Sequence, residues 1–238
     1  MSNAESLTEW PPNWHVEWVE STGSTNADLV KRAKVGNEDR VVLAADYQTA
    51  GKGRLDRRWE APAGANLLVS LLFRNLPVYL HELTQRVALA AQAACQLTTG
   101  LQPTLKWPND LLLDDRKLAG VLAEGGASSV GPFVVVGVGL NVGWAPPDAA
   151  RLGDGVTPQQ VLCALLAAFD ALPDDITPMY RSGLDTIGQL VRVELPDDNL
   201  VVGRAINVDA DGRLVVLDDC AVTHRIDTGD VVHLRRLS

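Results

Sequence analysis

Apolar runs of strand length alternate with segments of helical period up to about residue 187. The predicted strands cover residues 14–20, 41–47, 66–73 and 132–142, and residues 105–125 predict a hairpin around Asp114-Asp115-Arg116. Helical spacing of apolar residues predicts helices at residues 27–35, 80–99, 157–172 and 178–186, with Thr25 as the N-cap of the first. Because several of the strands are apolar nearly throughout, we expect a sheet buried on both faces.

The pattern changes from residue 188 onward. Short apolar strands at residues 191–195, 201–208, 214–217 and 231–234 are separated by turns rich in Asp, Gly and Pro. Short meandering strands of this kind are typical of a small β-barrel. The predicted fold class is therefore α+β, with a mixed β-sheet flanked by helices and a small barrel after it. The predicted divisions are an N-terminal tail (1–13), a larger domain (14–187) and the barrel (188–238).

The charge balance is acidic, with 30 Asp and Glu against 21 Lys and Arg. A general nucleic-acid-binding surface would need a basic excess, so DNA is not an expected partner. No run is long enough to span a membrane, and no signal peptide is visible. The three cysteines are far apart, which is typical of reduced thiols. We expect a cytoplasmic protein that does not bind a membrane and is a monomer or weak homodimer.

Residues 46–59 carry a local basic cluster in this acidic chain. Gly51 and Gly53 allow close approach of the backbone to a ligand. Four cations stand within seven residues: Lys52, Arg54, Arg57 and Arg58. Anionic groups, phosphates above all, would account for them. The open alternative is a mobile surface hairpin whose charges are solvated.

Lys117 stands on the second strand of the predicted hairpin, beside small residues. Strict alternation would place Lys117 and Ala119 on one face, from which the lysine could reach into a pocket. It could instead be an edge lysine that discourages aggregation. Asp110 could pair with Lys117 or Lys106, or form an Asx turn.

Two further features point to a ligand. Gly137 and Gly139 remove side chains from one face of a buried strand, which is costly unless a backbone or a flat ligand approaches. Asn141, at the end of that strand, should have a hydrogen-bond partner. Ser24 and Thr25 flank a helix N-terminus, where they could bind a ligand or act only as caps.

In order and spacing, these segments resemble biotin protein ligases over nearly the whole chain, from about Trp14 to Arg236. The Ser24-Thr25-Asn26 turn also stands where that family has its own. The motifs that carry the resemblance are Gln48-Thr-Ala-Gly-Lys-Gly-Arg54, Gly64-Ala-Asn-Leu67, Lys106-Trp-Pro-Asn-Asp110, Arg116-Lys-Leu-Ala-Gly120 and Gly137-Val-Gly-Leu-Asn141.

The resemblance implies a class II synthetase-like catalytic domain, an SH3-like barrel and a two-step reaction. Biotin and MgATP would give biotinyl-5′-AMP and pyrophosphate. The biotinyl group would then pass to a lysine of the biotin carboxyl carrier domain of an acyl-CoA carboxylase. Biotin and MgATP would be substrates, with no tightly bound prosthetic group and no fixed metal site.

The resemblance also implies roles for individual residues. Lys117 would bridge biotin's carboxyl oxygen and the α-phosphate, Asn141 would read adenine, and Trp59 would shelter the nucleotide or be ordinary core. Asn109 and Asp110 would orient Lys117 or Mg²⁺. The implied catalytic residues are Lys117, Arg54 and Asp110. The implied biotin-binding residues are Ser24, Thr25, Asn26, Gln48, Gly51, Lys52, Gly53, Arg54, Lys117, Gly120 and Gly137. The implied ATP-binding residues are Lys52, Arg54, Arg57, Trp59, Asn109, Lys117 and Asn141.

The sequence also departs from the family. Lys52 stands where many relatives have arginine, and Leu55-Asp56 interrupts the basic run. The segment before the first strand is too short for the helix-turn-helix of some relatives, so we expect no DNA binding. The alternatives are a lipoyl or octanoyl ligase or transferase, a non-catalytic ligand sensor, and a carrier-binding scaffold.

Overall fold

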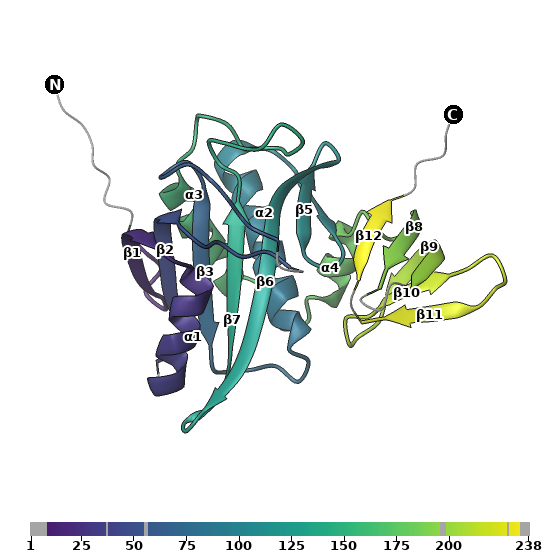
Figure 1. The fold of residues 1–238 in the computed structure, drawn as a ribbon, viewed down its shortest axis with the longest axis horizontal. Helices are drawn as coiled ribbons and strands as arrows, with labels where there is room; N and C mark the ends of the chain where they lie inside the picture. The colour runs from purple at the N-terminus through teal and green to yellow at the C-terminus, as the bar shows by residue number, and fades with distance from the viewer. Residues whose placement is uncertain (1–8, 37, 55–56, 196–198, 228, 234–238) are drawn as a thin grey trace.

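The computed structural model describes residues 9–36, 38–54, 57–195, 199–227 and 229–233. Their strands form a seven-stranded sheet in the order β1-β2-β3-β7-β6-β5-β4 and a five-stranded sheet in the order β11-β10-β9-β8-β12 (Figure 1). The elements of the larger part are β1 (His15–Thr22), α1 (Thr25–Val35), β2 (Val41–Gln48), β3 (Leu67–Phe73), α2 (His81–Thr99), β4 (Thr104–Lys106), β5 (Asp110–Leu113), β6 (Arg116–Ser128), β7 (Gly131–Leu140), α3 (Pro158–Asp170) and α4 (Thr177–Gly183).

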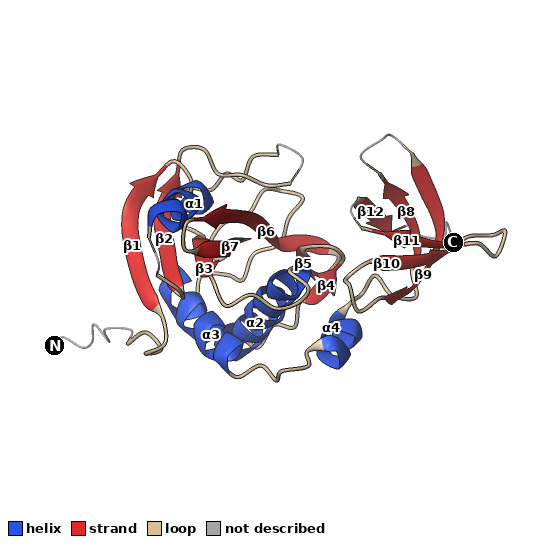
Figure 2. Cartoon of the chain, turned by 90° about the horizontal axis from the view of Figure 1, so that it is seen from below, coloured by secondary structure: helices blue, strands red, loops and turns tan. Residues whose placement is uncertain are grey.

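The large sheet is mixed, as the α+β prediction requires. Strands β1 and β2 pair in parallel, whereas every other pairing in this sheet's described strands is antiparallel. Helix α1 lies on one face of the sheet, and α2 and α3 lie on the other (Figure 2). Each face therefore has its own apolar layer: a small one under α1 and a larger one under α2 and α3.

The face under α1 changes character along the strands. On β7, Phe133 and Val135 belong to the apolar layer under α1, and Gly137 and Gly139 continue the same face by alternation. On β3, Leu72 is in that layer and Ser70 comes next on the same face. One end of this face is therefore packed core, and the other end is lined by glycine and a hydroxyl.

Helix α1 begins one residue earlier than an N-cap at Thr25 would require. Ser24 has extended backbone angles, and its hydroxyl accepts a hydrogen bond from the Ala27 N–H at 3.5 Å. The predicted cap at Thr25 is therefore wrong, because Ser24 takes that place. The Thr25 N–H and hydroxyl can then contact other groups.

The predicted hairpin of residues 105–125 is three strands, β4, β5 and β6. Between β5 and β6 the register shifts: Leu111 faces Ala119, whereas Leu112 faces Lys117, so Leu118 is an extra residue. A β-bulge of this kind turns later side chains to the other face. The prediction that Lys117 and Ala119 share a face is wrong: a side chain on Gly120 would meet Lys117 Nζ at 3.4 Å, and Ala119 is buried in the core.

The second sheet is antiparallel and is formed by β8 (Leu190–Glu194), β9 (Leu200–Val208), β10 (Leu214–Leu217), β11 (Thr223–Ile226) and β12 (Asp230–His233). It is the small β unit that the sequence predicts. Strand β11 was not predicted, because Thr223-His-Arg-Ile has little apolar character. The division of the chain at residue 188 stays a prediction.

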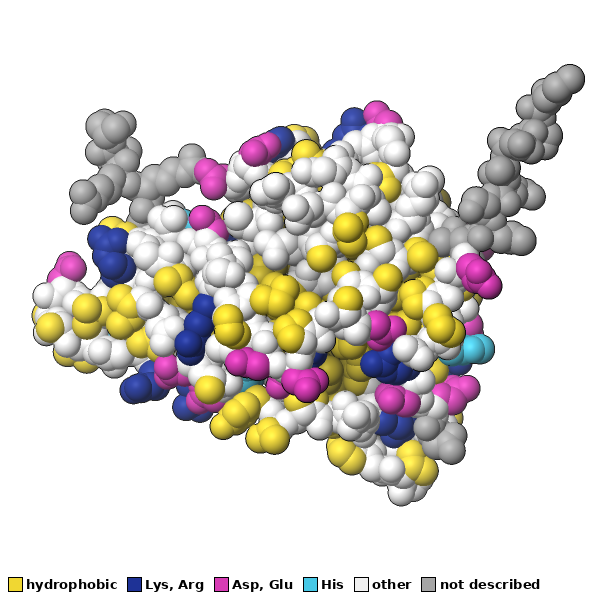
Figure 3. Space-filling model, turned by 180° about the vertical axis from the view of Figure 1, so that it is seen from behind, with side chains coloured by type: hydrophobic (Ala, Val, Ile, Leu, Met, Phe, Trp, Pro, Cys, Tyr) yellow, Lys and Arg dark blue, Asp and Glu magenta, His cyan; other side chains and the backbone are white. Residues whose placement is uncertain are grey.

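The outer surface over α2 and α3 is mixed in character. Figure 3 shows acidic side chains lying next to basic ones on this face, with apolar side chains interspersed. Among the described residues, no helix is both long enough and apolar enough to cross a bilayer.

Candidate functional site

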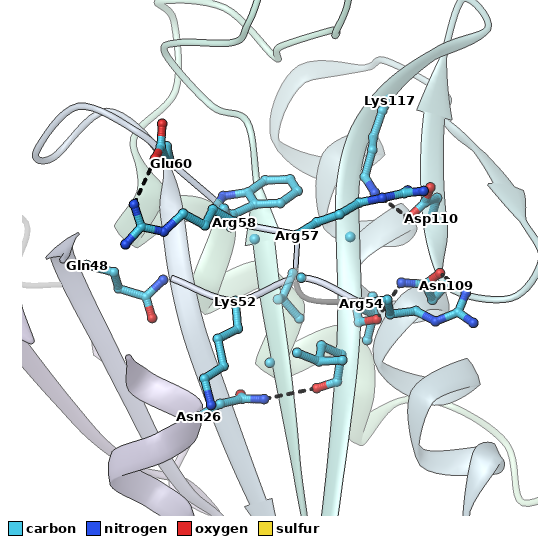
Figure 4. Close-up of a pocket in the computed structure, with 18 of the residues that line it drawn as sticks. Asn26, Gln48, Lys52, Arg54, Arg57, Arg58, Glu60, Asn109, Asp110 and Lys117 are labelled. Carbon is cyan, nitrogen blue, oxygen red and sulfur yellow. Dashed lines mark hydrogen bonds and ion pairs between the residues drawn. The ribbon is translucent and has the colours of Figure 1, made fainter. Parts of the chain in front are cut away.

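A pocket of about 310 Å³ opens where the face of the large sheet under α1 loses its side chains. It has two chemically different ends, seen in Figure 4 as Asn26 and Gln48 on one side and Asp110 and Lys117 on the other. We call the first the hydroxyl end, made of Ser24, Thr25, Asn26, Gln48 and Ser70. We call the second the cationic end, made of Arg54, Arg57, Asp110, Lys117 and Asp230.

The hydroxyl end is a chain of neutral hydrogen bonds. Gln48 Oε1 accepts from the Thr25 backbone N–H at 2.8 Å and lies 3.1 Å from Thr25 Oγ1. Thr25 Oγ1 lies 2.7 Å from Ser70 Oγ, which donates to Asn26 Oδ1 at 2.5 Å. Because Thr25 is the first residue of α1, its N–H has no partner within the helix and turns to Gln48 instead.

Asn26 lies flat against strand β7, where Gly137 has no side chain. A Cβ on Gly137 would lie 2.3 Å from Asn26 Oδ1, closer than any real contact. The Asn26 Nδ2 donates across to the Leu122 carbonyl of β6 at 3.3 Å. The predicted space at Gly137 therefore exists, and in this structure Asn26 fills it.

Trp59 fills the corresponding space at Gly139. A Cβ there would lie 2.4 Å from the indole ring, so only glycine permits this packing. The indole Nε1 is buried and has no hydrogen-bond partner among the described residues. Trp59 is thus part of the pocket wall, between the two ends.

Lys117 and Asp110 form the centre of the cationic end. Their charged atoms lie 2.7 Å apart, and Lys117 Nζ lies 5.8 Å from the Trp59 ring centroid. The bulge in β6 brings them together, because it puts Lys117 on the face that Asp110 and Gly120 share as cross-strand partners. Of the three possibilities for Asp110, the structure shows the ion pair with Lys117.

The glycine-arginine stretch forms a tight hairpin over the pocket. Lys52 and Arg58 form an antiparallel backbone bridge. The Gly53 N–H donates to the Arg57 carbonyl at 2.7 Å, and the Trp59 N–H donates to the Gly51 carbonyl at 3.1 Å. Leu55 and Asp56 interrupt the basic run of this stretch in the sequence. Both lie outside the residues that the structure describes.

Two arginines of this hairpin, Arg54 and Arg57, contact the small β unit. Arg57 pairs with Asp230, and Arg54 Nη1 donates to the Gly229 carbonyl at 3.2 Å. Arg54 also donates to Asn109 Oδ1 at 3.2 Å. Burial lowers the pKa of the Arg54 guanidinium from its ordinary value. The pocket therefore includes groups from both sheets.

Asn141 is 3% exposed and its amide is used within the chain. Nδ2 donates to the Ala150 carbonyl at 3.0 Å and to the Lys117 carbonyl at 3.5 Å, and Oδ1 accepts from Asn66 at 3.1 Å. The expected partner of Asn141 is thus confirmed. These bonds hold the segment around Ala150 beside the start of β6, and so position the backbone of Lys117.

The predicted site residues meet around this one pocket. Those that line it are Ser24, Thr25, Asn26, Gln48, Lys52, Gly53, Arg54, Arg57, Trp59, Asn109, Asp110, Lys117, Gly120, Gly137 and Asn141. Gly51 lies beside it, with a hypothetical Cβ 3.1 Å from Gln48 Nε2. Asn109 contacts Arg54, not Lys117 as one of the predicted roles would need.

Ser70 and Asp230 are among the pocket residues that were missed from the sequence. Ser70 is a lone hydroxyl within an apolar strand, and the rule that buried polar groups have partners could have flagged it. Asp230 gives no such signal, because it stands on the small β unit, far along the chain from the hairpin that it contacts.

Family models match both parts of the chain. The model of the biotin/lipoate A/B protein ligase family matches residues 18–141, and that of the biotin protein ligase C terminal domain matches residues 186–234. The chain therefore belongs to the biotin/lipoate A/B protein ligase family, and the resemblance stated from its motifs is confirmed.

Individual proteins agree with this assignment. The chain is 42% identical to the biotin--[acetyl-CoA-carboxylase] ligase of Mycobacterium tuberculosis, over 91% of this chain and 88% of that protein. It is 34% identical to the bifunctional ligase/repressor BirA of Escherichia coli, over 84% of this chain and 68% of that protein. The fold matches the biotin protein ligase of Aquifex aeolicus in complex with biotin and ATP, with a TM-score of 0.76 at 23% identity, over 93% and 99% of the two chains.

Proposed function

We propose that this protein is a biotin–[acetyl-CoA-carboxylase] ligase. It forms biotinyl-5′-AMP from biotin and ATP, and then transfers the biotinyl group to a lysine of a biotin carboxyl carrier domain. The observation that carries the proposal is the pocket with a neutral hydrogen-bonding end and a cationic end. Biotin has a neutral ureido ring at one end and a carboxylate at the other, and the α-phosphate must meet that carboxylate.

The first step joins two anions. The biotin carboxylate attacks the α-phosphorus and pyrophosphate leaves, so negative charge gathers at one point. Lys117 and Arg54 supply cations there, and Asp110 holds the Lys117 ammonium in place. An ammonium has three donors, so it can keep Asp110 and still meet two ligand oxygens. The catalytic contribution is then positioning together with electrostatic stabilisation.

The hydroxyl end receives the ureido ring. Ser24, Thr25 and Gln48 offer hydroxyls and an amide, and the glycine backbone at residues 51–53 allows close approach. In the second step, the carrier lysine amine attacks the acyl carbonyl and AMP leaves. No nucleophilic side chain of this chain takes part in that step.

Two of the roles implied by resemblance are revised. Asn109 holds Arg54, the residue we assign to the phosphates, so it acts through another residue. Asn141 holds the backbone of Lys117 and the Ala150 segment, and a base-reading role would require it to give up those bonds. Trp59, which lines the pocket with its ring near Lys117, is the better candidate for a contact with the nucleotide.

A lipoyl or octanoyl ligase is the second candidate, because the family model covers lipoate enzymes too. The rings and chains of those substrates carry no N–H or C=O groups for the hydroxyl end. They would leave its buried polar groups without ligand partners, which costs binding free energy. The hydroxyl end therefore favours biotin.

The partner protein and cellular setting belong to the proposal as well. The carrier domain of an acyl-CoA carboxylase is the expected protein substrate, in the cytoplasm. The absence of DNA and membrane partners, and the monomer or weak homodimer, stay predictions.

One experiment tests the function. The protein is incubated with MgATP, an apo carrier domain, and either biotin or lipoate, and the carrier is then probed by mass spectrometry. We expect the mass increase of one biotinyl group with biotin and none with lipoate. Attachment of lipoate alone would contradict the proposal, and a carrier whose acceptor lysine is changed to arginine serves as the control.

A further inference from the structure

Ser70 lies at the floor of the hydroxyl end, in the middle of strand β3. It is 0% exposed and pairs across the sheet with Gly137, the residue against which Asn26 lies. Its hydroxyl is within hydrogen-bond distance of both Thr25 Oγ1 and Asn26 Oδ1, at 2.7 and 2.5 Å. Ser70 is thus the link between two side chains that reach the pocket from α1.

The orientations of the two amides beside this link are fixed by backbone groups. Gln48 must turn its oxygen to Thr25, because the Thr25 N–H donates to it at 2.8 Å. Asn26 must turn its nitrogen to the Leu122 carbonyl, 3.3 Å away, which leaves its oxygen facing Ser70. An amide oxygen only accepts hydrogen bonds. The row of side chains from Gln48 through Thr25 and Ser70 to Asn26 therefore has an acceptor at each end.

The row is one proton short. It contains three oxygen–oxygen contacts, at 3.1, 2.7 and 2.5 Å, and only the two hydroxyls of Thr25 and Ser70 supply protons. The two shorter contacts fit donation from Thr25 to Ser70 and from Ser70 to Asn26, because a row of this sense strengthens each bond by polarising the next. The longest contact, between Thr25 Oγ1 and Gln48 Oε1, is then left without a proton.

This arrangement has a consequence for the ligand. When the Thr25 proton points inward to Ser70, the Thr25 oxygen and the Gln48 oxygen offer only lone pairs. An incoming N–H group would donate to them and supply the missing proton. A ring oxygen in the same place would meet two lone-pair groups and no donor. The polarity of the row therefore favours an N–H over an ether-type oxygen.

We propose that Ser70 is a specificity-determining positioning residue, which fixes the Thr25 hydroxyl as an acceptor and so selects ligands with a ring N–H. The inference rests on the proposed function and concerns the ureido ring of biotin. Ser70 itself does not contact the ligand, but acts through Thr25 and Asn26.

The test compares biotin with its two cyclic carbamate analogues, in each of which one ring N–H is replaced by oxygen. The kcat/KM for pyrophosphate release and the Kd from calorimetry are measured for the full chain and for Ser70→Ala. We expect the unchanged protein to prefer biotin over at least one analogue by about tenfold or more, the effect of one hydrogen bond to an uncompensated partner. In Ser70→Ala this preference narrows by about tenfold, because the Thr25 proton is released to donate to the ring oxygen.

Three further variants control the experiment. Ser70→Thr keeps the hydroxyl and retains the preference. Ser70→Cys keeps a similar volume but has a weaker donor, so it gives an intermediate preference for biotin over the analogues. If Ser70→Ala folds poorly, the preference of Ser70→Cys tests the role of the Ser70 hydroxyl in its place. Thr186→Ala removes a hydroxyl that is equally buried but accepts from the Trp107 backbone N–H and does not line the pocket, and it leaves the preference unchanged.

Two results would overturn the inference: an unchanged preference in both Ser70→Ala and Ser70→Cys, or no preference in the unchanged protein. A failure of the proposed function would look different, because the unchanged protein would then not release pyrophosphate with biotin at all.

Discussion

The two ends of the pocket are held by different kinds of interaction. At the hydroxyl end, Thr25, Asn26 and Ser70 are neutral, at most 5% exposed, and joined by hydrogen bonds within one region of the large sheet and α1. At the cationic end, the Lys117 and Arg57 side chains are 40% and 63% exposed, and their carboxylate partners come from β5 and from β12 of the other sheet.

The hydroxyl end is therefore suited to recognising hydrogen-bonding groups of the ligand, and the cationic end to recognising its charge. A buried hydrogen bond is costly to leave unmade, so the hydroxyl end keeps one arrangement and accepts only a ligand that completes it. An exposed ion pair contributes at most about 1 kcal/mol, so Asp230 can give way when phosphates arrive, whereas the Lys117 ammonium keeps Asp110 and still has donors for ligand oxygens. The neutral end is therefore suited to selecting the substrate, and the charged end to handling charge that moves during the reaction.

The largest effect should come from the centre of the cationic end. Lys117→Ala should slow biotinyl-5′-AMP formation by about 100- to 1000-fold, as for the loss of one preorganised donor to a developing anion. Biotin affinity, measured by calorimetry, should change far less, because the ring contacts remain. Lys31→Ala is the matched control, since Lys31 is 79% exposed and pairs only loosely with Asp28. Equal losses of affinity and rate would erase the distinction between the two ends.

A smaller effect is expected from overfilling the hydroxyl end. In Gly137→Ala the new methyl group would displace Asn26, which lies 2.3 Å from its position. Overpacking of this kind costs about 1–3 kcal/mol, so biotin should bind about 5- to 150-fold more weakly. Gly125→Ala on β6 is the control, because its nearest neighbour would lie at 3.9 Å. A rise in the KM for ATP of the same size would show that the ends are not independent.

The smallest effect concerns the contact between the two sheets. Asp230→Asn should release Arg57 and remove a negative charge from the pocket, which lowers the KM for ATP by up to about fivefold. Asp227→Asn breaks an exposed ion pair with Arg213 in the same small β unit and should leave the KM unchanged. A higher KM in Asp230→Asn would mean that Asp230 holds Arg57 in its working position and does not compete with phosphate.

The sequence predicts the elements whose side chains repeat with a clear period. Strands β2, β3 and β7 and helices α2 and α3 follow from such runs, and Thr157 with Pro158 marks the start of α3, where a capping box is found. Strand β11 could not be predicted, because its residues are mostly polar and its place depends on pairing with β10.

The same limit applies to the site. Lys117 and Gly137 were found because a charge or a glycine is unusual where they stand, whereas Gln48 was found only through the resemblance to biotin protein ligases. The contact of Asp230 with Arg57, like the roles of Asn109 and Asn141, depends on which atoms meet after folding. Neither composition nor spacing contains that information.

The extra residue in strand β6 shows how the length of a segment can specify chemistry. If β6 ran regularly through Leu118, without the bulge, every functional residue of the pocket would still be present in the sequence, yet strict alternation would turn Lys117 away from Asp110 and Gly120. A comparison that scores only residue identities would not distinguish these two arrangements. In protein design, the same pair could not be transferred to a regular hairpin by copying residues alone. The position of Lys117 in the pocket therefore depends on the number of residues between Arg116 and Gly120, and not only on their identity.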